Sequence, residues 1–273
     1  MTYYVASAAT EQESEARLTT KQLMTNLMRI HKSVFIISVV LLLACDAKQE
    51  ITLHLIGDST CAPKADNRRP ETGWGEKFKH FFNQNIKVRN NALNGRSTRT
   101  FIEEHRWDST LAALKAGDYV FIQFGHNDEV PTKKSYTSPD DFKANLKRFI
   151  LDTRAKKAIP VLLTPVSRRR FDEQGNFFDT HGEYGTYVRQ VAEETSVAFI
   201  DMQIISMAIL VRYGKKESTK LFLHCAEGEC SNYPNGIIDD THFSDFGATV
   251  MAEALSKALV DADMPLKHYI LEP

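Results

Sequence analysis

The sequence predicts an α/β fold, a three-layer α/β/α sandwich around a five-stranded parallel sheet. Two observations support this prediction. From residue 50 onward, short apolar runs alternate with longer amphipathic runs, which is typical of strands and helices that take turns along a chain. The 273 residues are enough for one large domain, and no internal repeat or low-complexity linker divides them. We therefore expect a single domain over residues 46–273.

The expected strands and helices alternate along this domain. The strands are predicted at residues 51–56, 86–91, 119–124, 160–164 and 197–200. The helices are predicted at residues 75–82, 107–115, 141–157, 184–194, 203–213 and 246–260. Because crossovers between parallel strands are right-handed, the helices should cover both faces of the sheet, as in flavodoxin-like folds.

Residues 218–241 show neither a strand period nor a helix period, and we expect a long loop there. Cys225 and Cys230 lie within this loop. A disulfide between them is the favoured interpretation for an exported protein, and two free surface thiols are the alternative.

The N-terminal segment predicts export. A basic stretch at residues 29–32 precedes an apolar run at residues 33–44, as in the charged and apolar regions of a signal peptide. This run is too short to span a bilayer comfortably. It ends in Leu-Leu-Ala-Cys45, which resembles the lipobox of bacterial lipoproteins, where cleavage precedes a cysteine that carries lipid. Residues 28–45 are therefore the expected signal peptide, and Cys45 is the expected lipidation site and membrane anchor. An ordinary signal peptide with an incidental cysteine is the alternative.

A signal peptide should begin a protein, yet 27 residues precede Met28. We interpret residues 1–27 as a dispensable or mis-annotated leader, with the true start at Met28 or Met24. The expected location is outside the cytoplasm, either lipid-anchored at the bacterial cell envelope or periplasmic or extracellular.

The charge balance and the cysteines exclude some function classes. The 34 Lys and Arg residues nearly cancel the 35 Asp and Glu residues, so nothing indicates a nucleic-acid partner. The four cysteines lack the paired spacing of a zinc site. We expect neither a metal ion nor a cofactor.

A candidate nucleophile follows the first predicted strand. The strand runs into Gly57-Asp58-Ser59-Thr60, which places Ser59 at the carboxyl end of a parallel strand, where open α/β sheets bind ligands. Such triplets are also common in turns and helix caps, so this motif alone is weak evidence.

Glycine and amide side chains follow the next two strands. The second strand runs into Asn94-Gly95, and the third into Gly125-His126-Asn127-Asp128. The backbone N–H of Gly95 and the amide of Asn127 are candidates to join the N–H of Ser59 in an oxyanion hole. Taken singly, each is more often an ordinary turn residue.

A candidate base precedes the last helix, in Asp239-Asp240-Thr241-His242-Phe243-Ser244. Ser244 is the expected helix cap. A carboxylate three residues before a histidine can curl back to Nδ1 and leave Nε2 to take a serine proton. This spacing favours Asp239 over its neighbour Asp240.

Together these four segments resemble the blocks of the SGNH or GDSL hydrolase superfamily, with Ser59, Gly95, Asn127 and His242 in that order. Within the superfamily, Gly73-Trp74-Gly75 and the Asp-x-Thr-His motif resemble the rhamnogalacturonan acetylesterase branch. The resemblance implies the SGNH hydrolase fold and a serine esterase that uses a Ser-His-Asp acyl-enzyme mechanism. The implied substrate is acetylated plant cell-wall polysaccharide or oligosaccharide of the pectin type.

Two alternatives remain at this point. One is a lipid-directed acylhydrolase or thioesterase on the same fold, and the other is a non-catalytic glycan-binding surface lipoprotein. Candidate substrate contacts are Trp74 as a sugar platform, His126, and Arg168 with Arg169 as partners of galacturonate carboxylates. A core position for Trp74 and a solvated basic turn for the arginines are the competing interpretations.

Overall fold

The structure, a computed structural model, describes residues 24–25, 27–28 and 50–271. The chain divides into two units, Met1–Gln49 and Glu50–Pro273, and each is described by itself. The four described residues of the first unit are helical. The apolar run at 33–44 and Cys45 lie outside the described residues. Of the helices in the described ranges, none is both long and apolar enough to cross a membrane.

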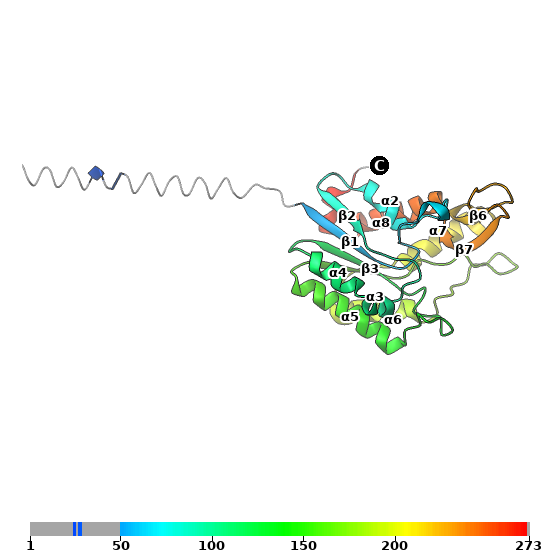
Figure 1. The fold of residues 1–273 in the computed structure, drawn as a ribbon, viewed down its shortest axis with the longest axis horizontal. Helices are drawn as coiled ribbons and strands as arrows, with labels where there is room; N and C mark the ends of the chain where they lie inside the picture. Colours follow the sequence, from blue (N-terminus) through cyan, green and yellow to red (C-terminus); the bar gives the residue numbers. More distant parts are fainter. Residues whose placement is uncertain (1–23, 26, 29–49, 272–273) are drawn as a thin grey trace, which may run out of the picture. The chain divides into compact units, whose positions relative to one another are not determined.

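Five parallel strands form the central sheet of the second unit (Figure 1). They are β1 (Ile51–Gly57), β2 (Ile86–Asn90), β3 (Tyr119–Gln123), β4 (Ile159–Leu163) and β5 (Ala198–Ile200). Their order in the sheet is β2-β1-β3-β4-β5, and every neighbouring pair is parallel. This arrangement confirms the predicted fold class, and it brings the carboxyl ends of β1 and β3 side by side.

Helices cover both faces of this sheet, as Figure 1 shows. One layer holds α2 (Trp74–Phe78), α7 (Met202–Glu217) and α8 (Asp245–Asp261), and the other holds α3 (Thr98–Glu103), α4 (Arg106–Ala113), α5 (Pro139–Ala155) and α6 (Tyr184–Thr195). Short 3-10 helices lie at Asp66–Arg68, Lys79–Phe81, Ser218–Leu221 and Pro265–Tyr269. Phe121 of β3 faces the first layer, while Val120 and Ile122 face the second. Each face of the sheet thus has its own apolar core.

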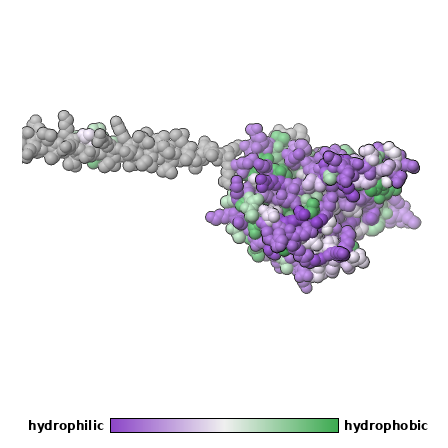
Figure 2. Space-filling view, viewed as in Figure 1, coloured by the Kyte–Doolittle hydropathy of each residue, from purple (hydrophilic) through white to green (hydrophobic). Residues whose placement is uncertain are grey.

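The surface over these cores is mainly polar. On the side shown in Figure 2, residues 50–271 present a mostly hydrophilic face with small, separate hydrophobic areas. The largest aromatic side chains lie inside instead, since Trp74, Trp107, Phe121 and Phe149 are almost fully buried. Burial of such side chains is a main source of the stability of the fold.

Capping side chains set where two long helices begin. Ser138 accepts a hydrogen bond from the Asp141 N–H, and Pro139 occupies the first turn of α5. Ser244 accepts from the Gly247 N–H at 3.0 Å, which confirms it as the cap of α8. His242 lies two residues before this cap, so the fixed start of α8 constrains the backbone position of His242.

The structure corrects the expectation of a plain loop over residues 218–241. Phe222–Cys225 (β6) and Ile237–Phe243 (β7) pair as a two-stranded antiparallel sheet. Phe222 and Phe243 lie in the core with ring centroids 5.2 Å apart, and they anchor this hairpin. A disulfide joins Cys225, the last residue of β6, to Cys230 in the segment between the two strands. The polar residues of β7 interrupt the alternation by which a strand is usually recognised.

Candidate active site

The turn after β1 places Ser59 at the edge of the sheet. Asp58 Oδ1 accepts hydrogen bonds from the backbone N–H of Thr60 at 2.9 Å and from its hydroxyl at 2.8 Å, an Asx-type turn that bends the chain around Ser59. A Cβ at Gly57 would lie 2.6 Å from the Gln123 carbonyl oxygen, so only glycine fits there. Asp58 is fully buried, and burial raises the pKa of its carboxyl group.

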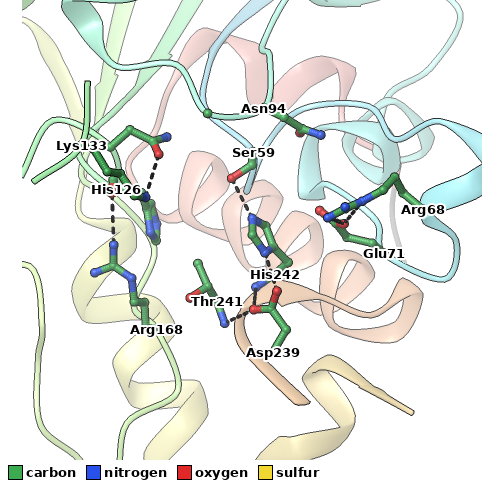
Figure 3. Close-up of a pocket in the computed structure, with 12 residues that line it drawn as sticks. Ser59, Arg68, Glu71, Asn94, His126, Lys133, Arg168, Asp239, Thr241 and His242 are labelled. Carbon is green, nitrogen blue, oxygen red and sulfur yellow. Dashed lines mark hydrogen bonds and ion pairs between the residues drawn. The ribbon is translucent and has the colours of Figure 1, made fainter. Parts of the chain in front are cut away.

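Ser59, His242 and Asp239 form a continuous chain of contacts (Figure 3). The Ser59 Oγ lies 2.9 Å from His242 Nε2, and His242 Nδ1 lies 2.7 Å from Asp239 Oδ2. Asp239 Oδ1 also accepts from the backbone N–H groups of Thr241 and His242, at 2.8 and 3.0 Å. These bonds close a tight loop within β7, so that the carboxylate and the imidazole hold each other in place.

The charge of Asp239 suits this position. Burial by itself would raise the pKa of the Asp239 carboxyl, but the hydrogen bond and positive charge of His242, with the two backbone N–H groups, outweigh burial and lower the pKa to about 2. Asp239 is therefore ionised at neutral pH. An ionised carboxylate only accepts hydrogen bonds, so Nδ1 of His242 carries the proton and Nε2 is left as the acceptor that faces Ser59.

The neighbouring carboxylate, Asp240, points to a different set of partners. It lies 2.9 Å from both Arg169 and Arg170 and 2.8 Å from His224 Nε2. This arrangement corrects the expectation for Arg169, which does not line the cavity beside Ser59 and has its guanidinium group occupied by Asp240. Of the two adjacent carboxylates, only Asp239 contacts His242.

Three N–H donors lie at the cavity beside Ser59. Within residues 50–271, the backbone N–H groups of Ser59 and Gly95 donate to no protein acceptor. Gly95 has a φ of +76°, a conformation that favours glycine. The Asn127 amide donates to the Arg96 carbonyl at 3.1 Å and accepts from Lys133 at 3.3 Å. Since an ammonium group can only donate, this contact fixes which side of the amide carries the oxygen.

The cavity itself has a volume of about 480 Å³ and a polar wall. Its lining residues are Ser59, Arg68, Glu71, Asn94, Gly95, His126, Asn127, Lys133, Arg168, Asp239, Thr241 and His242. In Figure 3, His126, Lys133 and Arg168 lie on one side of the Ser59 hydroxyl, and Arg68 and Glu71 lie on the other. No aliphatic or carbocyclic aromatic side chain belongs to this lining. Such a wall favours a hydrated, hydroxyl-rich ligand over an acyl chain.

His126 contributes an unpaired imidazole to this wall. The residue is 3% exposed, and neither ring nitrogen has a hydrogen-bond partner within residues 50–271. Its ring lies edge to face with His181, with centroids 4.5 Å apart. Burial, reinforced by the positive charges of His181 and Arg168, lowers the pKa of His126 well below its usual range. A neutral imidazole offers one donor and one acceptor, as a sugar hydroxyl does.

Arg168 lines the cavity, but its guanidinium group is largely occupied by protein. It lies 2.5 Å from Glu129 Oε1 and donates to the Thr180 hydroxyl at 3.1 Å and the His126 carbonyl at 3.2 Å. Glu129 in turn lies 2.8 Å from His181 Nδ1. Arg168 thus holds the backbone of His126 in place.

The structure corrects the expectation that Trp74 is a sugar platform, because it places Trp74 in the core and away from the cavity. It is 1% exposed, its indole N–H donates to Gln123 Oε1 at 2.9 Å, and its ring packs edge-on against Phe78. A fully buried ring has no face to offer to a sugar. We therefore exclude Trp74 from the substrate contacts.

Sequence reasoning missed several charged residues of the site. Lys64, Arg68 and Glu71 all lie between the nucleophile motif and Gly73-Trp74-Gly75. Lys133 lies six residues after Asn127 and contacts it. The only indication in the sequence was their position between the motifs. Charged loop residues are usually solvated, so this position did not distinguish them from ordinary surface residues. In the described part of the chain, no group of three or more His, Cys, Asp or Glu residues is arranged to hold a metal ion.

Known proteins resemble this chain over most of its length. The profile of the GDSL-like Lipase/Acylhydrolase family matches residues 55–250. Rhamnogalacturonan acetylesterase RhgT of Bacillus subtilis (strain 168) is 38% identical over 225 residues, which cover 82% of this chain and 96% of RhgT. "Probable rhamnogalacturonan acetylesterase YesY" of the same organism is 33% identical, over 81% of this chain and 97% of YesY. The crystal structure of B. subtilis protein YxiM is similar with a TM-score of 0.69 and 26% identity, over 80% of this chain and 58% of that one.

Proposed function

This chain belongs to the GDSL-like Lipase/Acylhydrolase family and is a carboxylic ester hydrolase, and from this premise we propose that it removes O-acetyl groups from plant cell-wall polysaccharide of the rhamnogalacturonan type. The observation that carries the proposal is the Ser59-His242-Asp239 chain, which opens into a cavity with a mainly polar wall. A short acetyl group suits this cavity, because a longer acyl chain would find no aliphatic or carbocyclic aromatic side chain in its lining. The names of the two Bacillus relatives support the same substrate class.

The proposed mechanism is acyl transfer through Ser59. The Ser59 Oγ attacks the acetyl carbonyl carbon while Nε2 of His242 takes the hydroxyl proton, and Asp239 stabilises the imidazolium that forms. The N–H groups of Ser59, Gly95 and Asn127 bind the oxyanion of the tetrahedral intermediate. When the intermediate collapses, the imidazolium gives its proton to the departing sugar oxygen. Water, deprotonated by His242, then attacks the acetyl-enzyme carbonyl; when this second intermediate collapses, the imidazolium returns the proton to the Ser59 Oγ and acetate leaves.

Two residues beside Ser59 are proposed to contact the sugar. His126 has a free donor and a free acceptor at the cavity wall, which match a hydroxyl group next to the acetylated position. Within residues 50–271, the Lys133 ammonium has one hydrogen-bond partner, Asn127 Oδ1, so it retains donors for a uronate carboxylate. Arg168 supports the first contact through its bond to the His126 carbonyl.

The experiment that tests this function has two parts. The first measures acetate release from acetylated rhamnogalacturonan, acetylated xylan and acetylated homogalacturonan, with Ser59→Ala as the control. The second compares 4-nitrophenyl acetate with 4-nitrophenyl octanoate. We expect acetate release from the rhamnogalacturonan and a kcat/KM at least tenfold higher for the acetyl ester. Faster cleavage of the octanoyl ester, without acetate release from any polysaccharide, would instead support a lipid-directed acylhydrolase.

We also propose that the protein is exported and anchored by lipid at Cys45. The disulfide between Cys225 and Cys230 supports export, because disulfides persist in oxidising compartments. Radiolabelled palmitate fed to cells that express the full chain should label the wild type, and a Cys45→Ala variant should remain unlabelled. Equal labelling of the two proteins would refute the anchor.

A further inference from the structure

A buried lysine lies directly behind the nucleophile. The Lys64 ammonium lies 2.5 Å from the Ser59 carbonyl oxygen, 2.8 Å from Asn94 Oδ1 and 2.8 Å from Glu71 Oε1. The side chains of Lys64 and Glu71 are each only 1% exposed. The ammonium group therefore donates two hydrogen bonds, to the Ser59 carbonyl and Asn94, and its charge is paired with the Glu71 carboxylate.

These three oxygens belong to segments that the site depends on. The first is the carbonyl oxygen of Ser59, the residue that also carries the nucleophilic hydroxyl and one proposed oxyanion N–H donor. Asn94 immediately precedes Gly95, whose N–H is a proposed oxyanion donor, and Glu71 lines the cavity. Lys64 therefore connects the nucleophile turn, the turn after β2 and one wall of the cavity through a single charged group.

Stability alone does not account for this arrangement. Burial lowers the pKa of Lys64, while Glu71 acts in the opposite direction and favours the charged form. Removing both charges from water has a large cost, and a buried ion pair is often no more stabilising than apolar residues of similar size. A buried pair of this kind is better explained by the geometry that it imposes. Glu71 is also held by Arg68, through contacts of 2.8 and 3.0 Å.

We propose that Lys64 is a positioning residue of the ester-hydrolysis site, which sets the spacing between the oxyanion donors of Ser59 and Gly95. Its ammonium draws the Ser59 carbonyl and the Asn94 side chain to one point, so that the two turns cannot separate. Small displacements of catalytic groups cost large factors in rate, because the donors must fit the transition state. The inference rests on the proposed role of Ser59 as nucleophile.

The test uses Lys64→Met, an unbranched side chain one atom shorter, which removes the charge and the donors. We expect kcat for 4-nitrophenyl acetate to fall roughly 10- to 100-fold, with KM within threefold of wild type. We also expect the Ki of a boronic acid, which mimics the tetrahedral intermediate, to rise in proportion to the loss in kcat/KM. The matched control is Lys77→Met, since Lys77 on α2 forms an ion pair with Asp245 on α8 and lines no part of the cavity. The kcat, KM and boronate Ki of this variant should stay within twofold of the wild-type values.

A purely structural role gives a different result. In that case Lys64→Met lowers the melting temperature, but kcat and the boronate Ki measured well below that temperature match wild type, and the inference is overturned. If the single variant does not fold, Lys64→Met with Glu71→Gln removes both charges and leaves no unpaired buried carboxylate; the same losses are expected from it. Failure of the proposed mechanism is separate, because it would show as unchanged activity in Ser59→Ala.

Discussion

The two segments that meet at the Ser59 hydroxyl are built in different ways. The nucleophile segment follows a central strand and is buried, with Asp58 fully inaccessible and Ser59 8% exposed. The base segment lies on the small β6-β7 sheet, where the side chains of Asp239 and His242 are 22% and 24% exposed. Lys64, Trp74 and Gln123, from three other parts of the chain, hydrogen-bond to the first segment. In the second, contacts within four consecutive residues orient the Asp239 carboxylate and the His242 imidazole.

This difference indicates how each half should respond to substitution. On the nucleophile side, many buried contacts together determine the position of Ser59. A single substitution there should therefore both displace Ser59 and lower the stability of the fold. On the base side, one carboxylate sets the tautomer and orientation of His242, so a single substitution should remove activity while the fold persists. The pair Asp239 and Asp240 tests this directly, because the two neighbours differ only in their partners.

The largest effect is expected from Asp239→Asn, which leaves the shape nearly unchanged but no longer favours a proton on His242 Nδ1. We expect kcat to fall by roughly 10⁴-fold, the size typical for loss of this carboxylate in a Ser-His-Asp triad. Asp240→Asn is the matched control, since its partners are Arg169, Arg170 and His224, and kcat should change less than fivefold. Steady-state kinetics on 4-nitrophenyl acetate measure both. Equal losses would mean that the local contact does not determine activity.

An intermediate effect is expected at the oxyanion donors. Asn127→Ala removes the only side-chain donor proposed for the oxyanion, and kcat should fall by about 10²- to 10³-fold with little change in KM. The bond to the Arg96 carbonyl is lost as well, so a small decrease in melting temperature should accompany it. A change in KM alone would place Asn127 in ground-state binding and out of the oxyanion hole.

The smallest effect concerns stability and pH. The pKa of Asp239 is lowered to about 2, below its ordinary value of 3.8, so its ionised form stabilises the folded state. This stabilisation, about 2 kcal/mol, is fully present above pH 4 and is lost as the pH falls through 2. Chemical unfolding of wild type and Asp239→Asn should therefore differ by more at pH 6 than at pH 2. A difference that does not vary with pH would argue against the stabilisation of the Asp239 carboxylate by His242 and the two backbone N–H groups.

The sequence predicted the central sheet because its strands are short, apolar and separated by amphipathic helices. It also predicted which residues meet at the cavity, because Ser59, Gly95 and Asn127 each follow a strand whose end lies at the same edge. The β7 strand was missed because Asp239 and His242 are polar and half-buried, which removes the alternation of a strand. The helix Thr98–Glu103 was missed because six residues are too few to show a period.

Contacts between distant residues were beyond prediction from a single sequence. Arg169 pairs with Asp240 across 71 positions, and Lys64 contacts Asn94 across 30. No local pattern distinguishes such residues from solvated charges, and only the folded chain brings them together. Trp74 was instead assigned to the site although it lies in the core. An aromatic residue beside glycine is compatible with either a sugar platform or a core position, and the sequence does not distinguish the two.

Covalent labelling with a fluorophosphonate, followed by peptide mapping, tests whether Ser59 is the nucleophile and His242 its base. We expect a single adduct on Ser59, which is lost in Ser59→Ala and forms at least 10³-fold more slowly in His242→Ala. His224→Ala, which alters the other histidine of the hairpin, should be labelled at the rate of the wild type. An adduct on another residue, or equal rates in the two histidine variants, would contradict the assignment of Ser59 as nucleophile and His242 as its base.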